Sequence, residues 1–169
     1  MNRRPAFTLV ELVAVIVLTA ILTAASIEGL RGLAQWRIAS GIGRVEADVR
    51  YARDAALLSG RRTACVFDLS DQTYEVRQED EPSTGAMTAT VIDHPTTYQP
   101  WTVYVGDLAS GLQISSVNNV STPAIAFDGE GVPIQMTGTI LTANATIDFS
   151  DGAVLRVYAG SGLSEVVWP

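Results

Sequence analysis

The feature that most constrains this chain is an apolar run of membrane-spanning length near its start. Between residues 7 and 27 the only charged residue is Glu11, and two arginines lie just before the run. As a helix rising about 1.5 Å per residue, about 21 residues would be roughly 32 Å long, enough to cross the hydrocarbon core of a bilayer. No positive charge follows until Arg31, so the charge bias predicts a cytoplasmic N-terminus and a C-terminal domain outside the cytoplasm.

Two ordinary kinds of segment compete with this interpretation. A cleaved secretory signal also has a basic start, and Ala24-Ala25-Ser26 could serve as its cleavage site, but the apolar cores of such signals span roughly 7 to 15 residues. A plain signal-anchor helix has the right length, but it does not explain the presence of the charged residue Glu11. A carboxylate inside a membrane segment costs roughly 2 to 3 kcal/mol or more, which indicates a partner and a function.

The residues around Glu11 carry a family resemblance. The segment Ala6-Phe7-Thr8-Leu9-Val10-Glu11-Leu12 follows a short basic leader and resembles the prepilin processing and methylation motif of type IV pilins and type II secretion pseudopilins. The resemblance implies that a membrane-embedded aspartic peptidase cleaves between Ala6 and Phe7 and methylates the new amine of Phe7. Ala6 stands where the family usually has glycine.

The same resemblance implies an assembly role for Glu11. It would be the fifth residue of the mature chain, where the family carries a glutamate that pairs with the terminal amine of a neighbouring subunit. At an effective dielectric of about 20, opposite charges 4 Å apart attract by around 4 kcal/mol, comparable with the cost of holding the carboxylate in the bilayer. The alternative is a glutamate that reaches toward the interface, which predicts an anchor without a polymer.

After the apolar run, the pattern predicts an amphipathic continuation of the helix. Apolar residues recur at steps of three and four, as on one face of a helix: Ile38, Ile42, Val45, Val49, Ala52 and Ala56. Charged residues fall largely between them: Arg44, Glu46, Asp48, Arg50, Arg53 and Asp54. We expect the helix to continue to about Leu58 and to end at Ser59-Gly60, with Gly60 as the C-cap. Glycines 29, 32, 41 and 43 indicate either bends or close helix contacts.

From residue 61 onward the pattern changes to period two and predicts strands. The expected strands cover residues 64–69, 73–78, 88–92, 101–105, 112–115, 124–127, 139–141, 145–149, 154–158 and 164–168. Asp151-Gly152 is the strongest turn signal. Residues 79–85 and 93–97 are expected to be solvated loops. The fold class is therefore α+β, with a long N-terminal helix packed on an antiparallel β-rich head.

The predicted domains are a leader at 1–6, a transmembrane assembly segment at 7–28, an amphipathic helix at 29–60 and a periplasmic head at 61–169. The head, with Phe127-Asp128-Gly129-Glu130-Gly131 before a closing strand, looks like the H-type minor pseudopilins. All 11 basic residues are arginine and the formal net charge is -7; the head has four arginines and 13 acidic residues. Such an acidic head disfavours nucleic-acid binding.

Single residues give little sign of chemistry. The only cysteine, Cys65, is predicted to be a small core residue, and the alternative is a reactive thiol. The only histidine, His94, is predicted to be a solvated loop residue. Because there is one histidine, a multi-histidine metal site is excluded. Asp128 and Glu130 could ligate calcium, but their spacing matches no EF-hand loop and favours a turn. We therefore predict no enzyme activity, no cofactor and no metal.

The sequence thus predicts a structural pseudopilin of type II secretion, single-pass in the bacterial inner membrane. By the resemblance, its partners would be a prepilin peptidase, other pseudopilins or pilins, membrane lipid, and an inner-membrane assembly platform. Two alternatives stay open: a minor type IV pilin for fibre initiation or adhesion, and a membrane-anchored periplasmic binding module.

Overall fold

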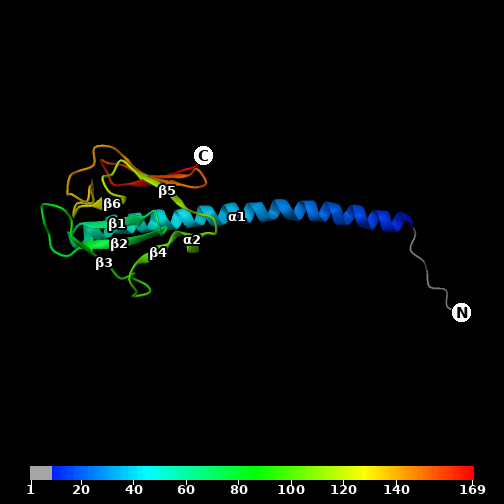
Figure 1. Cartoon of the computed structure of the whole chain (residues 1–169), viewed down its shortest axis with the longest axis horizontal. Helices are drawn as coiled ribbons and strands as arrows, with labels where there is room; N and C mark the ends of the chain where they lie inside the picture. The colour runs from blue at the N-terminus through cyan, green and yellow to red at the C-terminus, as the bar shows by residue number, and fades with distance from the viewer. Residues whose placement is uncertain (1–8) are drawn as a thin grey trace. The chain divides into compact units, whose positions relative to one another are not determined.

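The chain consists of one long helix followed by strands. The computed structural model describes residues 9–169, with the backbone alone for residues 24–32. They divide into two units, one ending at Trp36 and the other comprising Arg37–Pro169 (Figure 1). Helix α1, Leu9–Ser59, contributes to both units. The predicted continuation of the helix to about residue 58 is confirmed.

Gly60 ends helix α1. Its φ of 66° lies in the left-handed region, where a residue without a Cβ has no steric penalty. Its backbone N–H donates to the carbonyl of Ala56 at 2.9 Å, which satisfies one of the last carbonyls of the helix. The predicted C-cap is confirmed.

The second unit contains two antiparallel sheets (Figure 1). The six-stranded sheet has the order β3-β2-β1-β6-β7, with β4 also paired to β2. Its strands are β1 Thr63–Asp68, β2 Thr73–Glu79, β3 Ala89–Val91, β4 Thr102–Tyr104, β6 Ala124–Phe127 and β7 Pro133–Ile134. The four-stranded sheet has the order β10-β9-β8-β5. Its strands are β5 Ile114–Asn118, β8 Ala145–Phe149, β9 Val154–Val157 and β10 Ser164–Val167.

The structure corrects three of the predicted strands. The strand expected at 101–105 is present as β4 but is shorter, because the short helix α2, Val105–Leu108, begins directly after it. The strand expected at 112–115 begins at Ile114 and contains a bulge before Ser116. Residues 139–141 form no strand, and an isolated bridge joins Ile140 to Ile134 across the turn at Gly138.

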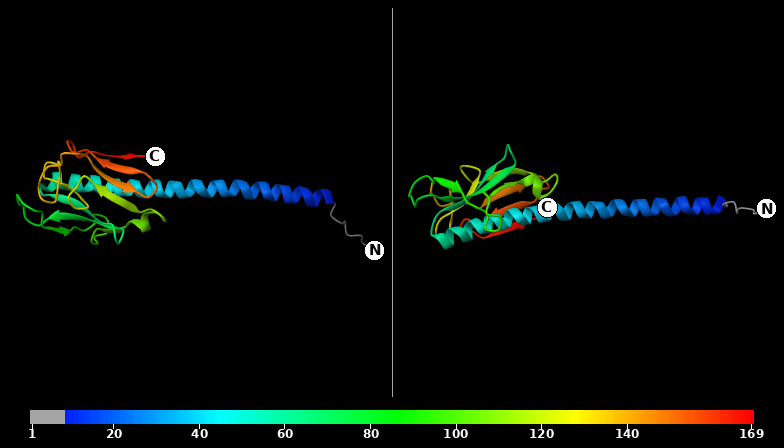
Figure 2. Two further views of the ribbon diagram at one scale, coloured as in Figure 1. Left: turned by 45° about the horizontal axis from the view of Figure 1, so that its top comes forward. Right: turned by 90° about the horizontal axis from the view of Figure 1, so that it is seen from below.

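The core lies between the sheets and the part of α1 that belongs to the second unit. Figure 2 shows both sheets alongside this part of the helix. The predicted helical stripe faces them with five fully buried side chains: Ile42, Val45, Val49, Ala52 and Ala56. They pack with residues from both sheets, such as Phe127 and Ile147. Burying a large apolar side chain contributes about 1.5 to 3 kcal/mol, so this stripe fixes the helix to the head.

Gly41 marks a close contact of the helix. A Cβ on Gly41 would lie 2.8 Å from Cδ2 of the buried Leu112 and 3.3 Å from Cβ of Leu108 in α2. A Cβ on Gly43 would meet no atom within 4 Å. Of the two explanations that the sequence left open for its glycines, close contact therefore applies at Gly41.

Candidate assembly helix and surfaces of the head

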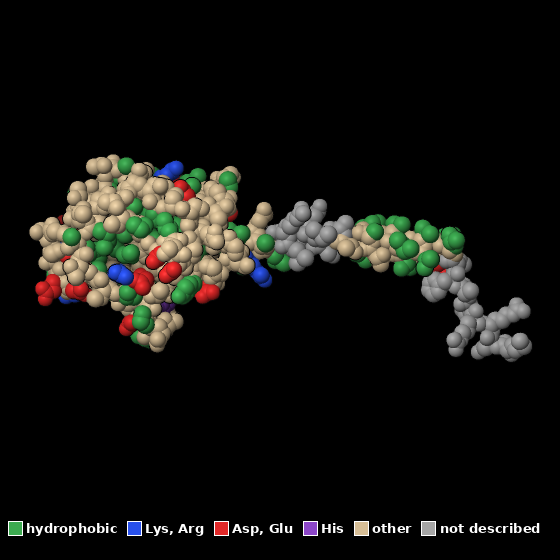
Figure 3. Space-filling model, viewed as in Figure 1, with side chains coloured by type: hydrophobic (Ala, Val, Ile, Leu, Met, Phe, Trp, Pro, Cys, Tyr) green, Lys and Arg blue, Asp and Glu red, His purple; other side chains and the backbone are tan. Residues whose placement is uncertain are grey.

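The N-terminal part of α1 exposes apolar side chains around its whole circumference. Figure 3 shows apolar side chains gathered on this part of the helix. The exposed large ones are Leu9, Val10, Leu12, Val13, Val15, Ile16, Val17, Leu18, Ile21 and Leu22. The hydroxyl of Thr23 donates to the carbonyl of Thr19 at 2.7 Å, so this polar group is satisfied inside the helix. A helix that is apolar on all sides is suited to burial among other helices or in lipid.

Glu11 lies in the first turn of α1 and is exposed. An acidic side chain at this position interacts favourably with the positive end of the helix dipole. The predicted cleavage site, Ala6 and Phe7, lies outside the described residues. Within the described part of the chain, no helix combines the length and the apolarity needed to cross a membrane. The span predicted at 7–28 stays a prediction.

A buried carboxylate connects α1 to the six-stranded sheet. Asp48 is 2% exposed, and its Oδ2 accepts a hydrogen bond from the Tyr74 hydroxyl at 2.6 Å. Its Oδ1 lies 3.0 Å from Nε of Arg44, one turn earlier on the helix. Asp48 lies between the stripe positions Val45 and Val49, as predicted, but it is buried and not solvated, because Arg44 and Tyr74 together satisfy its carboxylate inside the core. Burial and the nearby Asp48 raise the pKa of Tyr74.

A second buried ion pair joins the residue before β1 to the last residue of β2. Arg62 is paired with Glu79, and the two side chains are 7% and 3% exposed. Arg62 also donates to the hydroxyl of Ser83 and to the carbonyl of Gly85 at 2.7 Å. The hydrogen bond from Arg62, assisted by Ser83, lowers the pKa of Glu79 to about 2 against the opposing effect of burial. The expectation that Glu79 belongs to a solvated loop is wrong, since it ends strand β2 and holds residues 80–86 against the sheet.

Cys65 lies in the core, as the sequence predicts. It is fully buried on β1, and its thiol lies 3.6 Å from the backbone carbonyl of Asp48. Burial, with a smaller effect of Asp48, raises the pKa of the thiol. Because the thiolate is the reactive form, this environment makes Cys65 inert.

His94 is only partly solvated, which corrects the expectation for this residue. It lies in the predicted loop, but its ring packs against Trp101 with a centroid distance of 4.3 Å. Its Nε2 lies 2.8 Å from Nη2 of Arg44. The side chain therefore ties the loop to α1, a contact that sequence spacing could not reveal.

Asp128 forms a turn, as predicted. Its Oδ1 accepts hydrogen bonds from the backbone N–H groups of Glu130 and Val132, each at 2.9 Å. Glu130 is exposed. Residues 9–169 contain no group of three or more His, Cys, Asp or Glu side chains placed to hold a metal ion.

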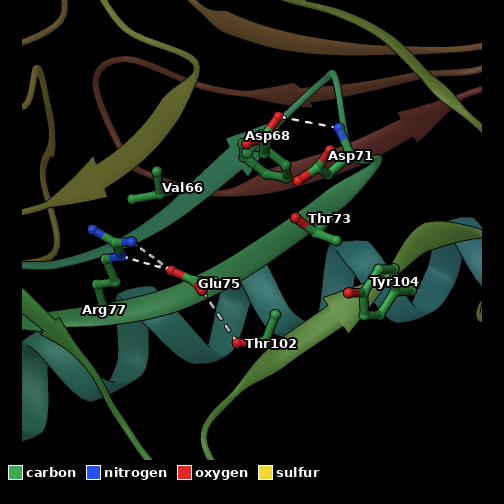
Figure 4. Close-up of a pocket in the computed structure, with 9 residues that line it drawn as sticks. Val66, Asp68, Asp71, Thr73, Glu75, Arg77, Thr102 and Tyr104 are labelled. Atoms are coloured by element: carbon green, nitrogen blue, oxygen red, sulfur yellow. Dashed lines mark hydrogen bonds and ion pairs between the residues drawn. The ribbon is translucent and has the colours of Figure 1, made fainter.

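A polar hollow of about 360 Å³ lies on the outer face of β1, β2 and β4. In Figure 4, Glu75 and Arg77 point toward each other, and Thr102 reaches Glu75 from the neighbouring strand. The corresponding distances are 2.6 Å and 3.3 Å. Asp68 accepts hydrogen bonds from the next turn, including one from the backbone N–H of Asp71 at 3.2 Å. These groups mainly satisfy one another, so the hollow presents a polar surface without an activated nucleophile.

The sequence matches two family models. Residues 1–27 match the prokaryotic N-terminal methylation motif, and residues 42–162 match the family described as type II transport protein GspH. The second match covers α1 from residue 42 onward and the strands from β1 to β9. A comparison with curated proteins found no match.

A solved structure shares the fold. The minor pseudopilin EpsH from the type 2 secretion system of Vibrio cholerae aligns with a TM-score of 0.56 at 9% sequence identity. The alignment covers 79% of this chain and 96% of that chain. The predicted pilin-like α+β fold is therefore confirmed.

Proposed function

Because the chain belongs to the type II transport protein GspH family, we propose that it is a minor pseudopilin, a structural subunit of a type II secretion pseudopilus. The match over residues 42–162 carries this proposal. It favours secretion over the two alternatives, a type IV pilus subunit and an anchored binding module. The proposed role is mechanical and not catalytic: the subunit supports the passage of other proteins across the outer membrane.

We further propose that the N-terminus is processed as a prepilin. The match of residues 1–27 to the methylation motif supports cleavage between Ala6 and Phe7 and methylation of Phe7. Before assembly, the segment at 7–28 would hold the precursor in the inner membrane, with the head in the periplasm. The apolar side chains exposed around residues 9–23 of α1 support burial of this segment in lipid and later among other helices.

In the assembled state, Glu11 would pair with the terminal amine of a neighbouring subunit. The partners would be other pseudopilins, a prepilin peptidase, membrane lipid and an inner-membrane assembly platform. The pairing would favour one axial offset between adjacent helices, because a shift of several ångströms separates the two charges.

Replacement of Glu11 in the native host tests this proposal. Glu11→Ala should leave membrane insertion and N-terminal processing intact and should lower the share of the chain recovered in sheared fibres about tenfold, the effect of losing about 1.4 kcal/mol. Secretion should fall with it. Asp54→Ala, which removes an exposed carboxylate farther along α1, is the matched control. Wild-type fibre recovery and secretion with Glu11→Ala would contradict the assembly role.

A further inference from the structure

The loop between β3 and β4 presents an exposed aromatic side chain from a defined backbone. An isolated bridge joins Asp93 to Pro100, and the backbone N–H of Tyr98 donates to the carbonyl of His94 at 2.9 Å. Tyr98, near the tip of this loop, is 78% exposed. These backbone contacts give the loop a defined conformation, and the loop places a large aromatic side chain in solvent.

Tyr98 has a backbone conformation that no side-chain hydrogen bond to another described residue stabilises. Its φ of 54° lies in the left-handed region, which bulky residues rarely adopt. Among the described residues, two other non-glycines have a positive φ, and each bonds a distant segment through its side chain. Gln72 donates to the carbonyl of Ile114 at 3.1 Å, and Asn119 donates to that of Asn144 at 2.8 Å. The side chain of Tyr98 makes no such bond in the described part of the chain, and its positive φ belongs to the turn that its N–H closes with the His94 carbonyl. Glycine would adopt this conformation without a steric cost, so the exposed ring is kept at this position at a cost.

An open hollow of about 640 Å³ lies beside this loop. Its lining includes Arg44 from α1, with His94 and Trp101 from the loop and its exit. Trp101 is 3% exposed, and its Nε1 is the one buried side-chain nitrogen or oxygen in the described part of the chain that lacks a hydrogen-bond partner. Buried polar groups in folded proteins are nearly always paired, so this donor requires an explanation.

Three groups that line the hollow, Arg44, His94 and Trp101, together offer more hydrogen-bond donors than acceptors. Arg44 is 45% exposed, whereas the Asp48 carboxylate that it pairs with is only 4% exposed and out of reach of a partner. Both ring nitrogens of His94 face donors, Nη2 of Arg44 at 2.8 Å and the backbone N–H of Thr96 at 3.1 Å. A neutral imidazole has one acceptor nitrogen, so it cannot satisfy both. An incoming carboxylate would give the Arg44 guanidinium a stronger, charge-assisted bond.

We propose that this hollow and Tyr98 form a docking surface for an acidic segment of a neighbouring protein subunit. The exposed Arg44 guanidinium donates to its carboxylate oxygens, and the ring of Tyr98 packs on the segment beside it, while Trp101, with its indole N–H unpaired, forms part of the wall of the hollow. The surface rests on the proposed function in one respect, that the partner is another subunit of the same fibre. The exposed guanidinium of Arg44 sets this surface apart from the rest of the acidic head and so gives it selectivity for an acidic segment.

Photo-cross-linking in the native host tests the surface. A benzophenone amino acid replaces Tyr98 in the full chain, and the same replacement at Tyr104, 58% exposed on β4, is the control position. The expected adduct at position 98 joins one fibre subunit through a peptide that contains Asp or Glu. Arg44→Gln should lower its yield about tenfold or more, the effect of losing a hydrogen bond to a charged group. Arg50→Gln, at an arginine that is likewise paired with an acidic residue one turn away, should not.

Three results would overturn the proposal: no adduct above the level of position 104, an adduct through a peptide without acidic residues or to lipid, or an unchanged yield with Arg44→Gln.

Tyr98→Gly separates docking from folding, because it relieves the strain and removes an exposed ring. Its melting temperature should equal or exceed that of the wild type while secretion falls; a lowered melting temperature would assign Tyr98 a structural role instead. Normal processing and fibre recovery without the adduct would refute the surface and leave the proposed function intact.

Discussion

The hydroxyl of Tyr74 donates a 2.6 Å hydrogen bond to Oδ2 of Asp48 and so joins the six-stranded sheet to the middle of α1. The bond lies inside the core, where both residues are at most 2% exposed. Arg44 pairs with the other carboxylate oxygen from the edge of the core. A helix that slid or rotated against the sheet would leave Asp48 charged and unpaired, so the bond fixes the register of the helix on the head.

Tyr74→Phe should therefore destabilise the protein with little change in shape. It removes one hydrogen bond to a charged acceptor and leaves that acceptor buried, which costs about 1.5 to 3 kcal/mol. Urea unfolding of the detergent-solubilised chain measures the loss. Tyr51→Phe, in a half-buried ring on α1, is the control and should cost less. Equal stability of the two variants would show that the Tyr74 bond contributes little.

Cys65 should resist thiol reagents while the protein is folded. Because burial raises the pKa of its thiol, almost no thiolate forms at pH 8 and the reagent has no access. The expected result is no labelling by iodoacetamide in the native chain and complete labelling in urea, read by intact mass. Stoichiometric labelling of the native chain would refute the packed core around β1.

The ion pair of Arg62 with Glu79 should make the head sensitive to acid. The pKa of Glu79 is lowered from 4.5 to about 2, mainly by the hydrogen bond from Arg62. A lowered pKa contributes stability that is complete above the unfolded value near 4.5 and is lost as the pH falls through about 2. Glu79→Gln should thus cost about 3 kcal/mol at pH 7, because it leaves Arg62 buried without its partner, and should flatten the pH dependence in that window.

The exposed pair of Arg156 and Glu165 provides the control for this prediction. Its atoms lie 3.1 Å apart, but both side chains are more than a third exposed. Glu165→Gln should change the free energy of unfolding by less than about 0.5 kcal/mol. If Glu79→Gln and Glu165→Gln had the same small effect between pH 2 and pH 7, the buried pair would not be the source of acid sensitivity.

Gly41 and Gly43 should respond in opposite ways to alanine. A Cβ at Gly43 meets no neighbour, so Gly43→Ala should stabilise the helix by about 0.5 to 1 kcal/mol. A Cβ at Gly41 would lie 2.8 Å from Leu112 in a packed region, so Gly41→Ala should destabilise by about 1 to 2 kcal/mol. Thermal unfolding of the two variants gives the comparison, and a stabilising Gly41→Ala would contradict the close contact.

The parts of the fold that the sequence predicted correctly depend on local patterns. The helix end at Gly60 follows from one residue that tolerates a positive φ, β6 follows from a short apolar run, and β8 follows from alternating apolar and polar residues. The turn at Asp151-Gly152 is confirmed by a Gly152 φ of 90° and by the bond from the Ala153 N–H to the Asp151 carboxylate at 3.1 Å. Each of these signals lies within a few residues of the structure that it specifies.

The errors share a different cause. Asp48 and Glu79 look like surface residues because nothing near them in the sequence reveals Tyr74 or Arg62, 26 and 17 residues away. The packing of His94 on Trp101 likewise depends on how the loop folds back. Burial of a polar group is decided by a partner from another element, which one-dimensional periodicity does not encode. The predicted processing and assembly residues, Ala6, Phe7 and Glu11, depend on other proteins and stay predictions.

The central claim, that the chain is made as a prepilin and matures into a fibre subunit, is tested most directly at its N-terminus. Intact and N-terminal peptide mass spectrometry of the protein purified from membranes of its native host gives the answer in one experiment. The account predicts a mature chain that begins at Phe7 with a methylated amine. A chain that still begins at Met1, or one that begins near Ile27, would contradict it.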